Sequence, residues 1–253
     1  MKSFLALILA LSMLTACSQQ KQPAPAPTPV SPQPAPAQQS ATPTVPEDAT
    51  LPVTLTMSED FKIVTIAKGG KTVTTVSVEN SPDAAPEVHI IKETPKSVYF
   101  NTCATGFGGY IFYRFCYGPG YRFDSTTNVV TKILSDGEIY DVSVNEDSFI
   151  WLPNGTKNAN TLKVRNMATK LDKTIIVPKK YNQHGDAKFS PDGKKIAYAA
   201  IVGDAENEQG SVIMVDLATG KQTYIVKDNP EDIYAIFGWT DNNTVDYGAM
   251  GGD

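Results

Sequence analysis

Residues 189–198 read FSPDGKKIAY, and residues 211–226 read SVIMVDLATGKQTYIV. Each stretch has the pattern of a β-hairpin, because turn residues separate two runs rich in Val, Ile and Tyr. Pro191 presets φ at the second position of the first turn, and Gly193 adopts a positive φ at little cost. In the second stretch, Gly220 supplies the left-handed turn position. Two successive hairpins predict one four-stranded antiparallel unit.

The same pair of hairpins recurs along the chain. Residues 142–151 (VSVNEDSFIW) lie 47 residues before the first hairpin and match it, and 161–170 (TLKVRNMATK) match the second. A weaker copy precedes them at 91–100 (IKETPKSVYF) and 121–128 (YRFDSTTN), and a single hairpin follows at 239–245 (WTDNNTV). A period near fifty residues with four strands per unit is typical of β-propeller blades. We therefore expect an all-β, small β-propeller-like domain of about four four-stranded blades.

Residues 61–76 form a further hairpin pattern around Lys68-Gly69-Gly70-Lys71. Repeat units of this kind cannot bury both faces alone, so each must pack against its neighbours. We expect the 61–76 hairpin to pair with the strands near Trp239 and Val245 and so to complete the last blade. An open or partial stack of sheets, or a sandwich, is the alternative architecture.

The stretch FSPDGKKIAY resembles the WD-like propeller repeat of the TolB family of bacterial periplasmic proteins. Similar repeats occur in the propeller domains of prolyl-oligopeptidase-type enzymes. The resemblance is good over 187–226, fair over 141–177 and faint elsewhere, and it implies a blade rather than a function. The chain departs from the family, whose members have six blades and a separate N-terminal domain, whereas this chain has room for about four blades.

The first 17 residues read MKSFLALILALSMLTAC. Lys2 precedes an apolar run over 4–14 that is too short to span a bilayer as a helix. Leu14-Thr15-Ala16-Cys17 resembles the bacterial lipobox, which implies cleavage before Cys17 and its acylation, including palmitate. Ser18 then implies the outer membrane, facing the periplasm, if the host is Gram-negative. An ordinary signal peptide with an unrelated cysteine is the alternative.

Ten of the 18 prolines lie between Pro23 and Pro52. Residues 18–52 consist mainly of Pro, Ala, Gln, Ser and Thr, which cannot bury enough apolar surface to fold. We predict a disordered spacer with polyproline II character, and a docking segment for a proline-recognising partner is the alternative. The predicted organisation is a signal peptide over 1–16, a lipidated tether over 17–52 and a repeat domain over 53–253.

Residues 99–123 (YFNTCATGFGGYIFYRFCYGPGYRF) contain ten of the 21 Tyr and Phe residues. Cys103 and Cys116 are expected to form a disulfide, because an extracytoplasmic compartment permits one. Tyrosine and arginine are enriched at protein interfaces, so the segment is a candidate recognition surface. The alternative is that the rings fill the spaces between blades. The candidate partner-binding residues are Tyr110, Tyr113, Arg114, Tyr117, Tyr121 and Arg122.

Several function classes are disfavoured by the composition. The formal charge of −5 argues against a nucleic-acid partner. Three cysteines and two histidines lack the spacing of a zinc site, and no familiar catalytic or phosphate-binding motif occurs. We therefore predict no catalytic residue, no metal and no cofactor. The sequence leaves the oligomeric state open. Only His184, Asp186 and Asp141 stand where they could serve a propeller enzyme.

These features favour a membrane-anchored envelope lipoprotein that presents a propeller-like domain to a protein or polysaccharide partner, and not an enzyme. One alternative is a propeller-type hydrolase or lyase that acts on envelope glycans or peptides. Another is a structural lipoprotein without a ligand of its own. Carboxylates converging in the centre of the propeller would favour the enzyme, whereas an apolar centre would exclude it.

Overall fold

The computed structural model describes residues 51–78, 86–108, 111–116, 118–153, 161–181, 183–203 and 208–250. The side chains of 86, 104–108, 111–115, 183 and 184 are not described. All described residues belong to the compact unit Thr44–Asp253. The signal peptide, Cys17 and nearly all of the tether lie outside them. In the described ranges, no helix is long and apolar enough to cross a membrane.

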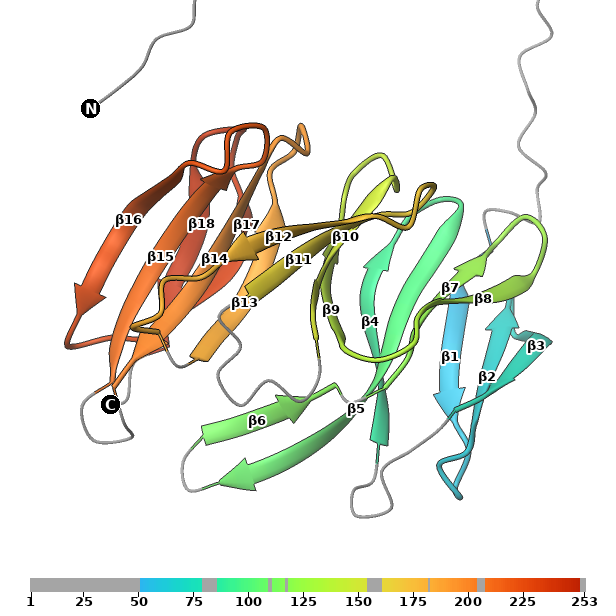
Figure 1. Cartoon of the computed structure of the whole chain (residues 1–253). Helices are drawn as coiled ribbons and strands as arrows, with labels where there is room; N and C mark the ends of the chain where they lie inside the picture. Colours follow the sequence, from blue (N-terminus) through green and yellow to red (C-terminus); the bar gives the residue numbers. More distant parts are fainter. Residues whose placement is uncertain are drawn as a thin grey trace, which may run out of the picture. The chain divides into compact units, whose positions relative to one another are not determined.

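Eighteen strands in the described ranges form five antiparallel sheets, named here sheets A to E in chain order (Figure 1). This confirms the predicted all-β, propeller-like fold. Two of the sheets have four strands whose order follows the chain. Sheet C consists of β9 (Glu138–Val142), β10 (Ser148–Leu152), β11 (Thr161–Asn166) and β12 (Asp172–Ile176). Sheet D consists of β13 (Gln183–Phe189), β14 (Lys195–Val202), β15 (Gln209–Asp216) and β16 (Gln222–Asn229).

The first turn of each of these sheets has the same geometry. In sheet D, the Ser190 N–H donates to the Lys195 carbonyl at 2.9 Å, and Gly193 has a φ of +68°. In sheet C, the Ser143 N–H donates to the Ser148 carbonyl at 2.9 Å. Glu146 there takes the positive φ, at 56°. The repeat recognised in the sequence therefore reflects one backbone turn built from different residues.

The second turns are equivalent as well. The Asp216 carboxylate accepts a hydrogen bond from the Thr219 N–H at 2.7 Å. The Asn166 side-chain oxygen accepts one from the Thr169 N–H at 2.9 Å. Asp124 accepts the Thr127 N–H in the same way in the preceding sheet, at 2.9 Å. Because the side-chain oxygen replaces water as the partner of turn N–H groups, Asp and Asn are favoured there.

Sheet B carries an insertion. Its main path is β4 (Pro86–Glu93), β5 (Ser97–Gly108), β7 (Gly120–Asp124) and β8 (Val129–Leu134), and β6 (Ile111–Phe115) pairs with the far end of β5. Figure 1 shows β5 and β6 as a two-stranded ribbon. A disulfide joins Cys103 to Cys116, and both residues are buried. The predicted disulfide is therefore present, at the end of the ribbon nearest the main sheet.

The first and last sheets correct the predicted closure. Sheet A consists of β1 (Val53–Met57), β2 (Ile63–Lys68) and β3 (Lys71–Ser77), and sheet E of β17 (Tyr234–Trp239) and β18 (Val245–Ala249). In the described ranges, no strand of sheet A pairs with β17 or β18, so the predicted pairing of 61–76 near Trp239 and Val245 is wrong. The reason is a turn at Ser58, whose N–H donates to the Ile63 carbonyl at 2.8 Å. This turn adds β1 and makes the hairpin part of a sheet of its own.

Four apolar cores lie between consecutive sheets, from A and B to D and E. In sheets B to E the first strands are β4, β9, β13 and β17, and each packs against the next in this order. We call these four the inner strands. The Asp141 carboxylate of β9 accepts a hydrogen bond from the Phe189 N–H of β13 at 2.8 Å. Lys92 of β4 lies 3.9 Å from the Asp141 carboxylate, so these three residues form a polar seam between sheets.

Candidate functional site

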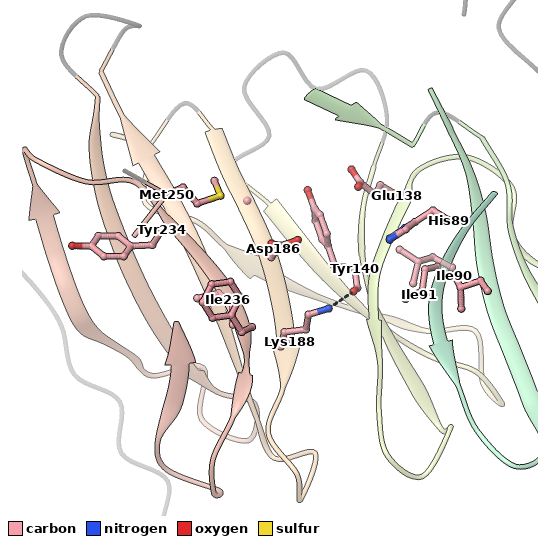
Figure 2. Close-up of a pocket in the computed structure, with 13 residues that line it drawn as sticks. His89, Ile90, Ile91, Glu138, Tyr140, Asp186, Lys188, Tyr234, Ile236 and Met250 are labelled. Atoms are coloured by element: carbon pink, nitrogen blue, oxygen red, sulfur yellow. Dashed lines mark hydrogen bonds between the residues drawn. The ribbon is translucent and has the colours of Figure 1, made fainter. Parts of the chain in front are cut away.

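A cavity of about 580 Å³ lies among the inner strands, and we call it the inner-strand cavity. Its walls come from β4, β9, β13 and β17 and from Met250, which follows β18 (Figure 2). Residues about 160 positions apart in the sequence therefore line one space. A concave site of this volume, lined by several elements, is the usual form of a small-molecule site.

One wall of the cavity is polar. Glu138 and Tyr140 come from β9, and Asp186 and Lys188 come from β13. Both strands are irregular here, since the register shifts opposite Ile139–Asp141 of β9 and between His184 and Ala187 of β13, and both pairs line the same space. His89 of β4 adds an imidazole to this side of the cavity. Figure 2 shows the Asp186 side chain beside Tyr140, and Glu138 near the Tyr140 hydroxyl.

The Tyr140 hydroxyl lies where the two carboxylates converge. Burial raises the pKa of Tyr140 well above its ordinary value, and the negative charges of Glu138 and Asp186 raise it further. A hydrogen bond to the Glu138 carboxylate acts in the same direction. The phenol is therefore a protonated donor to Glu138 at neutral pH. Both carboxylates are close enough to this hydroxyl to change its proton affinity.

The ammonium group of Lys188 is directed to the backbone. Its Nζ donates to the Tyr140 carbonyl oxygen at 3.4 Å, which is the contact drawn in Figure 2. Over the ranges that the structure describes, no lysine or arginine forms an ion pair with Asp186. The polar wall therefore offers more acceptor than donor groups.

Apolar side chains flank the polar residues on two sides, and part of this apolar surface reaches solvent (Figure 2). Ile90 and Ile91 of β4 and Ile236 and Phe237 of β17 contribute to it, together with Met250. Phe237 is 64% exposed and Met250 is 53% exposed. Large side chains left this exposed beside a cavity are available to an apolar ligand. The cavity can therefore hold a ligand with one polar end and one apolar part.

The structure separates Asp186 from Asp141, two of the three residues that the sequence suggested for an enzyme. Asp186 lines the cavity, whereas the Asp141 carboxylate is held in the seam by Phe189 and Lys92. Burial raises the pKa of Asp141, an effect that the Phe189 N–H and the Lys92 charge partly offset. The His184 side chain lies outside the described part of the chain. Asp141 is therefore a structural acid and not part of this site.

Sequence reasoning missed Glu138, Tyr140 and Lys188. The spacing Glu138-x-Tyr140 on one inner strand and Asp186-x-Lys188 on the next was the available signal, since alternate positions share a face. The sequence carries no information on how the two strands pack against each other, and this packing decides which side chains line the cavity.

The aromatic segment is only partly described. Tyr121 is 2% exposed and stacks on Phe100, with 5.2 Å between ring centroids, so it belongs to the core and is not a surface residue. Arg122 donates to the Ser97 hydroxyl at 2.9 Å and to the Asp124 carboxylate at 3.3 Å, and it lies 3.9 Å from the Glu146 carboxylate of sheet C. The predicted role of Tyr121 in partner binding is therefore corrected, whereas that of Arg122 stays a prediction. Tyr110, Tyr117 and the side chains of Tyr113 and Arg114 lie outside the described residues.

One group of side chains in the described ranges has the composition of a metal site. A nitrogen of His89 and the sulfurs of Cys103 and Cys116 lie within 4.8 Å of one another. The two sulfurs are already bonded to each other, and thiolates are the form in which cysteine binds metal. The group instead places the disulfide next to the wall of the cavity.

The chain matches no family model, and no curated protein matches its sequence. Solved structures do resemble it. Oligogalacturonate lyase from Vibrio parahaemolyticus matches with a TM-score of 0.50 and 16% identity, over 80% of this chain and 54% of the lyase. The likeness is one of fold.

Two further structures are similar over most of this chain. Dipeptidyl peptidase 4 from Porphyromonas gingivalis matches with a TM-score of 0.48 and 9% identity, over 81% of this chain and 37% of the peptidase. TolB from Acinetobacter baumannii matches with a TM-score of 0.35 and 15% identity, over 79% of this chain and 60% of TolB. The chain thus spans between about a third and three fifths of the length of these three proteins.

Proposed function

We propose that this protein is an envelope lipoprotein, anchored through Cys17, whose propeller-like domain is a binding module. The observation that carries the binding role is the inner-strand cavity, where polar and apolar side chains line the same space. A purely structural lipoprotein has no need of a cavity that brings Glu138, Tyr140 and Asp186 together where solvent reaches them.

The anchor and the tether complete this proposal. Two or three acyl chains on Cys17 hold a protein stably at a membrane, whereas one chain does not. A proline-rich segment of 35 residues (18–52) extends to roughly 100 Å at about 3.1 Å per residue, enough to lift a domain off the surface. The domain is then free to meet a protein or polysaccharide of the envelope.

The ribbon formed by β5 and β6 is a second candidate surface for a macromolecular partner. It extends from sheet B beyond the pairing of β5 with β7, and the disulfide ties its two strands together. Tyr110, Tyr113, Arg114 and Tyr117 lie on or next to it in the sequence. These four residues remain our candidates for contacts with an envelope protein or polysaccharide.

Crosslinking in intact envelopes tests the binding role. We expect the wild-type chain to recover one or more specific partners or ligands, and Asp186→Asn or the pair Tyr113→Ala and Tyr117→Ala to reduce that recovery. Glu231→Gln changes an exposed acid outside the cavity and serves as the matched control. Equal recovery by all of these folded variants would contradict the binding role.

Labelling with a fatty-acid probe tests the proposed anchor at Cys17. An unlabelled wild-type protein, or a label that persists in Cys17→Ala, would contradict the anchor.

Hydrolysis or lysis of an envelope glycan or peptide is the second candidate function. It is favoured by acid–base side chains that share the cavity, namely Glu138, Tyr140, Asp186 and Lys188. Turnover separates the two proposals. A binding module retains its ligand unchanged, whereas an enzyme converts it, and mass spectrometry of the recovered ligand distinguishes the outcomes.

A further inference from the structure

The inner-strand cavity has an uneven charge. Glu138 and Asp186 are its two carboxylates, and Lys188 is its one lysine. The Lys188 ammonium already donates to the Tyr140 carbonyl. Anions are therefore disfavoured on this wall, and a single positive charge would balance it.

The carboxylates belong to different sheets, and both influence the Tyr140 hydroxyl. Glu138 lies on β9 and Asp186 on β13, and the two strands pack against each other. The Tyr140 hydroxyl donates to Glu138 and feels the charge of Asp186. A group placed beside this hydroxyl thus has acceptors from two strands and the phenol oxygen. A protonated amine, with its several N–H donors, suits such a set of acceptors.

The apolar wall determines what carries the amine. Ile236, Phe237 and Met250 line one side of the cavity, where Phe237 and Met250 are exposed, and Ile90 and Ile91 line another (Figure 2). An inorganic cation gains nothing from this wall. An aliphatic or aromatic group attached to the amine does gain binding free energy, because its apolar surface is removed from water on binding.

We propose that the inner-strand cavity binds the protonated amino group of an organic ligand, with the ligand's apolar part against the side formed by Ile236, Phe237 and Met250. This inference rests on the proposed binding function and specifies the ligand class for the cavity. Asp186 and Glu138 hold the ammonium, and Tyr140 fixes the position of Glu138. Amines with an apolar side chain, including the N-terminal residue of a peptide, have this chemistry.

Two small probes test the proposal by calorimetric titration of the full-length chain at neutral pH. L-leucine amide has a protonated amine and an apolar side chain. N-acetyl-L-leucine amide has the same side chain and no charge. We expect leucine amide to bind at least about tenfold more tightly, the difference that one charge-assisted hydrogen bond makes.

Three variants locate the effect. Asp186→Asn is expected to weaken binding of leucine amide at least about tenfold, since it removes one charge partner. Phe237→Ser changes an exposed side chain and is expected to weaken binding of both probes. Glu231→Gln is expected to bind as wild type does. The folded state of each variant is checked by circular dichroism.

The outcomes separate this inference from the proposed function. Equal binding of both probes, abolished by Phe237→Ser, would overturn amine recognition and leave the ligand cavity standing. Binding of Mn²⁺ or Ca²⁺ that needs Glu138 and Asp186, and that leucine amide does not displace, would also overturn it. Binding of neither probe overturns the inference, and the envelope crosslinking then decides the proposed function alone.

Discussion

The seam and the inner-strand cavity are built on the same strands but serve different purposes. In the seam, Asp141 accepts the Phe189 N–H and lies near Lys92, so its carboxylate fastens neighbouring sheets. In the cavity, Tyr140, one residue earlier, points to a space that the chain does not fill. The pairing of β9 with β10 shifts register between these residues, and Tyr140 lines the cavity whereas Asp141 does not. Stability and binding are therefore expected to respond to different mutations.

The largest effect is expected where a backbone packs against a glycine. A Cβ on Gly210 of β15 would lie 2.2 Å from the Asp232 carbonyl oxygen and 2.8 Å from the Ile233 Cα, both in the link to β17. Because backbone atoms cannot move aside cheaply, Gly210→Ala should lower the free energy of unfolding by about 3 kcal/mol or more. Gly238→Ala meets nothing within 4 Å and should change it by less than about 1 kcal/mol. Urea unfolding measures both, and equal values would contradict the close packing.

The next effect is expected in the seam. Asp141→Ala leaves the buried Phe189 N–H without its acceptor and should cost about 2 kcal/mol. Asp141→Asn keeps an oxygen that can accept this hydrogen bond, so it should cost less. Thermal and urea unfolding compare the two variants. If Asp141→Asn were as damaging as Asp141→Ala, the charge and not the hydrogen bond would fasten the sheets.

Acid should weaken the fold through the carboxylates outside the seam. The Arg165 guanidinium lowers the pKa of Asp172, to which it donates at 2.7 and 2.9 Å, and Lys180 lowers that of Asp228. Their stabilisation is present above the ordinary carboxyl pKa and is lost as pH falls through the lowered values. We expect the free energy of unfolding to fall between about pH 5 and pH 3.

Asp141 opposes this trend. Because the pKa of Asp141 is raised in the folded state, the folded protein binds this proton at a higher pH than the unfolded chain does. The contribution of Asp141 to the free energy of unfolding therefore rises as pH falls. The free energy of unfolding of Asp141→Asn should therefore fall more steeply on acidification than that of wild type, and that of Asp172→Asn should fall less steeply. Urea unfolding at several pH values measures these slopes. Identical slopes for both variants would contradict the assignment.

The fold was largely predictable because turn chemistry repeats. Pro191 and Gly193 mark one turn plainly, and Asp216 marks another. The equivalent turn at Ser58 escaped notice, because Phe61 takes the positive φ that Gly193 takes in sheet D. Without this turn, β1 was not expected, and the hairpin of residues 61–76 was placed in the last blade.

The cavity was much less predictable. Asp141 and Asp186 look alike in the sequence, since both are acids near the same kind of turn. Which of them faces the cavity depends on how β9 and β13 pack, and on the register shift in β13 between His184 and Ala187. The burial of Tyr121 was equally hidden, because alternation along a strand does not say which face meets another sheet.

The smallest effect on stability is expected in the cavity, and the largest on binding. Glu138→Gln keeps an acceptor for Tyr140, and Asp186→Asn removes a charge that forms no ion pair with a described lysine or arginine. Each should change the free energy of unfolding by less than about 0.5 kcal/mol, as most substitutions away from packed features do.

A paired measurement on Asp186→Asn and Asp141→Ala tests the division between cavity and seam most directly. For each variant, the affinity for leucine amide and the free energy of unfolding are determined under the same conditions. We predict that Asp186→Asn loses affinity and keeps its stability, and that Asp141→Ala loses stability and keeps its affinity while folded. If each variant lost both properties, the cavity and the seam would not have separate roles.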